Sequence, residues 1–119
     1  MSIEESTPYN VQNIICLTKN FVRGGLNVII SYPVSSESHR LIERELSDLK
    51  QSMYAFTLAP RLEVALRNRG GRQLADWEVK KIKQDYAEGF HQPDYGTVID
   101  NSDQTPEETS ELILKKIKL

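Results

Sequence analysis

Apolar residues recur along the chain in two spacings, one typical of amphipathic helices and the other of buried strands. Near the N-terminus they fall three or four positions apart, which predicts a helix that Gly24 and Gly25 end. The positions are Val11, Ile14, Ile15, Thr18, Phe21 and Val22. Three later runs, residues 26–31, 53–58 and 96–100, predict strands. The first of them is largely apolar and rich in β-branched side chains, as in a strand buried on both faces of a parallel sheet.

Helices are predicted after each of these strands. Ser35 or Ser36 can cap a helix that runs to about residue 49. Pro60 opens the helix after the second strand, and a further amphipathic helix is predicted over residues 75–86. These helices separate the three strands from one another along the chain.

The last helix has the strongest start signal. Thr105 is its expected N-cap, Pro106 its first residue, and Glu108 completes a capping box. At the other end of the chain, residues 1–8 are polar and are expected to be disordered. Strands that alternate with helices predict an α/β fold with a parallel three-stranded sheet, and the length of 119 residues fits one small domain.

Composition and charge argue against several classes of protein and site. The net charge is −2, so the chain lacks the basic field of a nucleic-acid-binding protein. No signal peptide or membrane span is visible, and we expect a cytoplasmic protein without a membrane partner. The single cysteine, Cys16, lies in the apolar helical pattern and is expected to be a buried, inert thiol. His39 and His91 have no neighbours at metal-ligand spacing, so no metal site is predicted.

A cluster of arginines lies between two predicted helices. Arg67, Arg69 and Arg72 surround the pair Gly70 and Gly71. Guanidinium groups stay charged and donate paired hydrogen bonds, which matches the geometry of phosphate oxygens. The glycines would let the segment close over a ligand and reopen. The alternative is a solvated turn with ordinary surface arginines.

Four motifs in this order resemble the second half of the P-loop small-molecule kinases, which include shikimate, gluconate, adenylate and chloramphenicol kinases. They are GGLNVIIS, YAFTLAP with RLEVALRNRGGR, DWEVKKIKQDY, and GTVIDNSDQTPEET. The resemblance is closest to the AAA-type kinase-like proteins of bacteria, and it covers residues 9–117. It implies a three-layer αβα fold with a parallel sheet and a helical lid over residues 61–90. The implied reaction is phosphorylation of a small hydroxylated metabolite, with ATP and Mg²⁺ as cofactors.

The resemblance also implies roles for individual residues. Arg69 and Arg72 would clamp the transferred phosphoryl group as catalytic residues, and with Arg67 they would bind the phosphates of the nucleotide. Asn101 and Ser102 lie in the turn that matches the adenine-facing loop of the family.

The acceptor side of the family's site matches the end of the first predicted strand. Tyr32 and Ser35 correspond to the wall of the substrate pocket. Ser31 stands where related sequences often carry an acidic residue, and a serine is a poor catalytic base.

The phosphate-binding loop of the family, G-x-x-x-x-G-K-[ST], does not occur in this sequence. In the family it comes from a preceding strand and helix of about 50–70 residues. We therefore expect this chain alone to be inactive. Without the central strand of the family, residues 27–31 and 54–58 would have unpaired edges, which favours a homo-oligomer or a rearranged pairing.

Three functions compete at this point. The first is a truncated ATP-dependent kinase whose partners are a nucleotide and a small-molecule substrate. The second is a non-catalytic binding or assembly remnant of the kinase fold, which the missing loop and Ser31 favour. The third is an anion-binding protein that uses Arg67, Arg69 and Arg72 alone.

Overall fold

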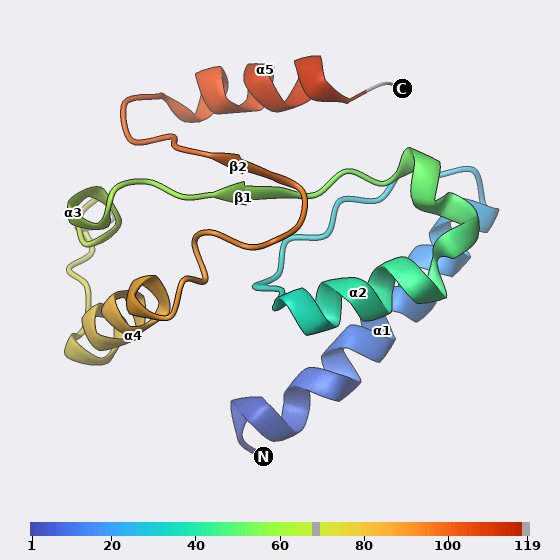
Figure 1. Ribbon diagram of the computed structural model, residues 1–119, viewed down its shortest axis with the longest axis horizontal. Helices are drawn as coiled ribbons and strands as arrows, with labels where there is room; N and C mark the ends of the chain where they lie inside the picture. Colours follow the sequence, from blue (N-terminus) through green and yellow to red (C-terminus); the bar gives the residue numbers. More distant parts are fainter. Residues whose placement is uncertain (68–69, 118–119) are drawn as a thin grey trace. The chain divides into compact units, whose positions relative to one another are not determined.

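The chain forms two compact units, which are Met1–Met53 and Tyr54–Leu119. The computed structural model describes residues 1–67 and 70–117, apart from the side chains of residues 50 and 51 (Figure 1). The first unit contains the helices α1 (Ile3–Arg23) and α2 (Ser36–Glu45) and the 3₁₀ helix η1 (Ser47–Ser52). The second contains β1 (Phe56–Leu58), α3 (Leu62–Ala65), α4 (Asp76–Ala87), β2 (Thr97–Ile99) and α5 (Pro106–Lys116).

Helix α1 begins earlier than the sequence pattern predicted. The Ser2 hydroxyl accepts a hydrogen bond from the Glu5 amide at 3.1 Å, and the Glu5 carboxylate accepts one from the Ser2 amide at 2.7 Å. This capping box satisfies two of the free amides at the helix start. The prediction of a disordered segment at residues 1–8 therefore differs from the structure, which includes Pro8 within the helix. The predicted end is confirmed, because Gly24 is the C-cap and Gly25 has a φ of 80°.

The core of the first unit lies between α1 and α2. Its buried members are Val11, Ile15, Ile42 and Leu46. Cys16 is exposed, so the prediction of a buried thiol is wrong. Successive helical residues are about 100° apart around the helix axis. Cys16 therefore lies to one side of the buried face that contains Ile15.

The run at residues 26–31 is not a strand, which corrects the prediction of a three-stranded sheet. It connects α1 to α2 as an irregular segment, and the side chain of Ile29 is 95 % exposed. Its β-branched residues favour an extended backbone, but a strand also needs a neighbour that pairs with it. Within the described residues no such neighbour pairs with this segment.

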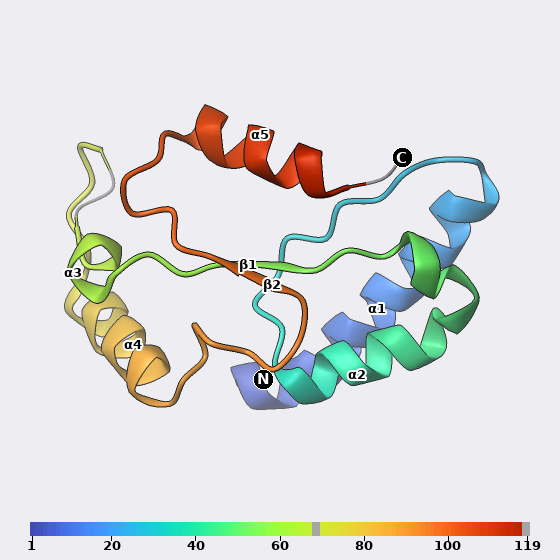
Figure 2. The ribbon, with the colours of Figure 1, turned by 45° about the horizontal axis from the view of Figure 1, so that its top comes forward.

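The two later predicted strands are confirmed, although each is shorter than predicted. β1 and β2 pair in parallel, with Phe56 opposite Thr97 and Leu58 opposite Ile99, and they lie side by side in both views (Figures 1 and 2). Ile99 is only 5 % exposed. The structure is therefore an α/β fold with a two-stranded parallel sheet.

Gly96 allows the chain to enter β2. Its φ is 66°, and a Cβ atom there would lie 2.5 Å from the carbonyl oxygen of Ala55. The same carbonyl accepts a hydrogen bond from the Thr97 amide at 2.9 Å. Only glycine permits both this conformation and this close approach.

The helices of the second unit begin largely where the sequence predicted. Thr105 caps α5, Pro106 is its first residue, and Glu108 closes the capping box. α4 begins after Ala75, whose amide donates to the Glu78 carboxylate at 3.1 Å. α3 has only four residues, so the predicted arginine-bearing helix is shorter than expected. No helix within residues 1–67 and 70–117 is both long and apolar enough to cross a membrane.

Candidate functional site

Two loops leave the parallel strands at the same edge of the sheet. Because Leu58 and Ile99 are opposite each other, the segments after β1 and β2 begin side by side. They carry the strand-end cluster, which we define as Arg61, Asp100, Asn101, Ser102 and Asp103. The carboxyl edge of a parallel sheet is where α/β proteins bind their ligands.

Arg61 ties the two loops together. Its backbone amide donates to the Ser102 hydroxyl oxygen at 2.8 Å. Its guanidinium donates to both carboxylate oxygens of Asp103, at 3.1 and 3.4 Å, and to Glu63 at 2.9 Å. These hydrogen bonds, above all the one to Asp103, raise the pKa of Arg61 above its ordinary value. The loop after β1 is thereby held against the loop after β2.

Asp100 stabilises the turn after β2. The amide of Ser102 donates to the Asp100 carboxylate at 3.0 Å, and the Ser102 hydroxyl donates to the same oxygen. An aspartate that accepts from the amide two residues later forms an Asx turn. These bonds, with a smaller contribution from the charge of Arg61, lower the pKa of Asp100. The carboxylate is ionised and engaged in structure, which makes it a poor proton acceptor.

Asn101 presents an unpaired acceptor. Its side-chain oxygen Oδ1 is buried and has no hydrogen-bond partner among the described residues. Buried polar atoms are nearly always paired, because an unpaired one costs about 1–3 kcal/mol. A donor that reached this oxygen would remove that cost, and a ligand could reach it only after the Asn101 side chain moved, because the atom has almost no exposed surface.

A second unpaired atom occurs after α4. The Nδ1 atom of His91 is also buried without a partner among the described residues. The His91 ring stacks on Tyr86 with 4.3 Å between centroids and 11° between planes. The Tyr86 hydroxyl donates to the carbonyl of Pro60, directly before Arg61. Helix α4 is therefore joined to the loop that follows β1.

The structure describes two of the three arginines that were predicted to bind phosphates, Arg67 and Arg72. Arg72 donates to the Glu78 carboxylate at 2.7 Å, which raises the pKa of Arg72 and supports the start of α4. Arg67 is exposed beyond the end of α3, and its charge contributes to the lowered pKa of Glu63. Neither Arg67 nor Arg72 forms a hydrogen bond or ion pair with the strand-end cluster in the described residues. Arg69 lies outside the described residues.

The two predicted substrate-binding residues belong to the first unit, where each has an internal partner. The Ser35 hydroxyl accepts from the Ser38 amide at 3.1 Å and caps α2. The Tyr32 hydroxyl accepts from the side-chain amide of Asn10 at 3.4 Å. The structure thus gives Ser35 a capping role, which the sequence also predicted.

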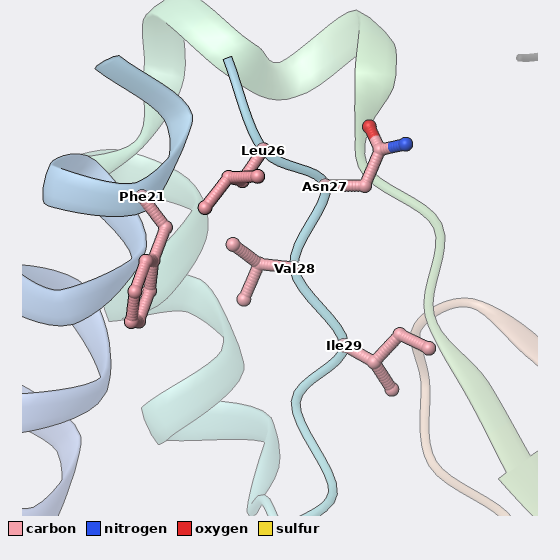
Figure 3. Close-up of a pocket in the computed structure, with 5 residues that line it drawn as sticks. All are labelled: Phe21, Leu26, Asn27, Val28 and Ile29. Atoms are coloured by element: carbon pink, nitrogen blue, oxygen red, sulfur yellow. The ribbon is translucent and has the colours of Figure 1, made fainter. Parts of the chain in front are cut away.

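An open hollow of about 310 Å³ lies in the first unit, between the end of α1 and the segment that follows it. Figure 3 shows Leu26 and Val28 pointing toward Phe21, whereas Asn27 and Ile29 point the other way. None of the described residues that line the hollow has a titratable side chain.

In the described residues, no three His, Cys, Asp or Glu side chains are grouped so that they could hold a metal ion. For a nucleotide, the Asn101 oxygen could accept from the amino group of a base, and exposed arginines could meet phosphates. Comparison of the chain with protein-family models, curated proteins and solved structures gives no match.

The sequence analysis named Asn101 and Ser102 through the matched turn and gave no role to Arg61. The available signal was its position three residues after the apolar run 53–58, beyond the carboxyl end of a predicted strand. An arginine there is close to any ligand bound at the sheet edge.

Proposed function

We propose that this chain is the nucleotide-facing part of an ATP-dependent phosphotransferase whose acceptor is a small hydroxylated metabolite. The observation that carries the proposal is the buried, unpaired Oδ1 atom of Asn101 at the carboxyl edge of the parallel pair. An adenine amino group is a donor of the right kind for this atom. The motif resemblance assigns the same loop to the adenine.

The remaining members of the strand-end cluster position that oxygen. The Ser102 hydroxyl oxygen accepts a hydrogen bond from the backbone amide of Arg61, and the hydroxyl donates one to Asp100. Three loop residues are therefore fixed beside Asn101. A preorganised loop binds its ligand without first losing conformational freedom. In this proposal these three residues hold the loop, and a movement of the Asn101 side chain brings its oxygen to the base.

The arginines would meet the phosphates. Arg72 is engaged with Glu78, but its side chain is 57 % exposed. Such surface pairs contribute only about 0–1 kcal/mol, so several phosphate charges can compete for the guanidinium. Because the sequence contains no G-x-x-x-x-G-K-[ST], we expect binding without phosphoryl transfer by this chain alone.

Nucleotide titration tests the proposal. Adenosine, ATP and inorganic triphosphate would be added to the full chain, with binding followed by calorimetry and by the fluorescence of Trp77, the single tryptophan. We expect Asn101→Ala to weaken adenosine binding roughly tenfold, because one hydrogen bond to a buried oxygen is lost. Asn27→Ala, at an exposed asparagine in the first unit, is the matched control. Absence of adenosine binding, or equal affinity in Asn101→Ala, would contradict the proposal.

A second candidate is a simple anion-binding protein, favoured by the exposure of Arg67 and Arg72 on either side of Gly70, whose φ is 60°. The same titration separates the two functions. Triphosphate binding that Arg72→Ala reduces, in a chain that does not bind adenosine, would support the anion-binding function instead.

A further inference from the structure

The Glu78 carboxylate is shared between an arginine and the start of helix α4. Its Oε1 atom accepts a hydrogen bond from Arg72 Nη1 at 2.7 Å and another from the Ala75 amide at 3.1 Å. The Glu78 side chain is 19 % exposed, whereas that of Arg72 is 57 % exposed. The arginine is therefore the solvent-facing member of the pair, and the carboxylate is the member held against the protein.

The departure of Arg72 would leave the Glu78 carboxylate with a partner. The carboxylate would keep its hydrogen bond to the Ala75 amide, at the positive end of the α4 dipole. Release of the guanidinium therefore costs no more than an exposed ion pair contributes, which is less than about a tenfold change in an equilibrium constant. A ligand with several negative charges can supply that much.

The backbone directly before Arg72 permits such a movement. Gly70 has a φ of 60°, and among the described residues nothing lies within 4 Å of a Cβ atom added to Gly70 or Gly71. Neither glycine is packed against a neighbour that would resist a change in its backbone angles. Short loop positions of this kind act as hinges that carry side chains to and from a ligand. Arg72 can therefore leave Glu78 while helix α4 stays in place.

We propose that Glu78 is a positioning residue, which holds Arg72 until phosphate groups displace it and which lowers the affinity of this arginine for them. The guanidinium donates paired hydrogen bonds to carboxylate and phosphate oxygens alike, so one ligand replaces the other. After the exchange the charge of Glu78 stays close to the bound phosphates and repels them. The inference rests on the proposed contact between Arg72 and phosphates, and it adds that Glu78 sets the strength of that contact.

Glu78→Gln separates the two roles of the side chain. Glutamine completes capping boxes as glutamate does, so the helix start keeps its acceptor while the negative charge disappears. In calorimetric titrations of the full chain with inorganic triphosphate at low salt, we expect Glu78→Gln to bind roughly fivefold more tightly than the wild type. Its thermal midpoint should stay close to that of the wild type. Glu88→Gln, at an exposed carboxylate after the end of the same helix, changes the net charge equally and should leave the affinity unchanged.

A double substitution shows whether the gain in affinity passes through Arg72. In an Arg72→Ala background, Glu78→Gln should no longer strengthen the binding of triphosphate. Equal affinity in the wild type and Glu78→Gln, an equal gain in Glu88→Gln, a gain that persists without Arg72, or no triphosphate binding at all would overturn the proposal.

Titration of the same variants with adenosine keeps this inference apart from the proposed nucleotide site. Glu78→Gln should leave the affinity for adenosine unchanged, because adenosine has no phosphate for Arg72 to contact. Absence of adenosine binding, with the gain for triphosphate intact, would contradict the proposed function alone. Normal adenosine binding, with no gain for triphosphate, would contradict the role of Glu78 alone.

Discussion

Residues 26–31 and β2 are similar in sequence and different in structure. Both contain consecutive β-branched residues, and each contains an isoleucine near its end. In β2, Ile99 is opposite Leu58 of the neighbouring strand and is 5 % exposed. In the earlier run, Ile29 is 95 % exposed and belongs to no strand.

This difference separates two requirements for a strand. Side-chain shape makes an extended backbone favourable, and that requirement is local. A ladder also needs a second chain segment that offers amides and carbonyls in register, and that requirement depends on the rest of the fold. β1 and β2 supply each other with this partner, whereas residues 26–31 have none in the described residues.

The largest expected effect comes from truncating the two isoleucines. Ile99→Ala should lower the free energy of unfolding by about 2–5 kcal/mol, because it removes buried methylenes and leaves a cavity. Ile29→Ala should change the free energy of unfolding by no more than about 0.5 kcal/mol, because its side chain is already in water. Chemical denaturation at a concentration where the chain is monomeric measures both. Equal losses would show that residues 26–31 are packed as β2 is.

The entry into β2 offers a second contrast, between two glycines with positive φ. Gly96→Ala should destabilise the chain by about 2–4 kcal/mol, because strain from the positive φ adds to the clash with the Ala55 carbonyl. Gly89 has a φ of 80° with nothing within 4 Å of an added Cβ, so Gly89→Ala should cost only about 1–2 kcal/mol. Thermal unfolding of both variants isolates the contribution of the clash. Equal midpoints would mean that the backbones at 55 and 96 are less close than described.

The sequence predicted those parts of the fold that are encoded by neighbouring residues. The spacing of apolar residues placed α1 and α4, and Thr105 with Glu108 placed the start of α5. The early start of α1 was missed although Ser2 and Glu5 form a capping box, because the polar composition of the first residues was given more weight. The number of strands was missed because pairing partners cannot be identified from one apolar run.

The candidate site also contains residues that local sequence predicts and contacts that it does not. Asn101 and Ser102 lie two and three residues after the end of β2, and their position near the sheet edge is therefore predictable. The contact between Arg61 and Asp103 joins residues 42 positions apart, and no local pattern predicts it. The engagement of Arg72 with Glu78 was also unpredicted, because a charge cluster in the sequence does not show which carboxylate each arginine meets.

Helix caps should behave alike in the two regions, because both depend on local sequence. Ser35 caps the helix that follows residues 26–31, and Thr105 caps the helix that follows β2. Alanine at either position should cost about 0.5–2 kcal/mol, with the larger loss at Thr105, whose capping box also includes Glu108. Urea denaturation measures both losses. A negligible cost at Ser35 would indicate that α2 is held by the core around Leu46 alone.

The smallest expected effect concerns the titration of Asp100, which has no counterpart after residues 26–31. Hydrogen bonds from the Ser102 hydroxyl and amide lower the pKa of Asp100 below its ordinary value of 3.8. The stabilisation is therefore complete above about pH 4 and is lost as the pH falls through the lowered pKa of the folded state. Ser102→Ala removes the hydroxyl bond, which is the largest contribution, and should move the pKa of Asp100 back toward 3.8.

Carboxyl-carbon chemical shifts, followed from pH 6 downward, would report this titration residue by residue. Ser110→Ala, at an exposed position on α5, removes a hydroxyl without touching the turn and should leave the Asp100 midpoint unchanged. If Ser102→Ala also left it unchanged, the hydroxyl would not donate to the carboxylate in solution. The turn that places Asn101 at the sheet edge would then rest on the Ser102 amide, and the loop would be less rigid than the proposed nucleotide contact requires.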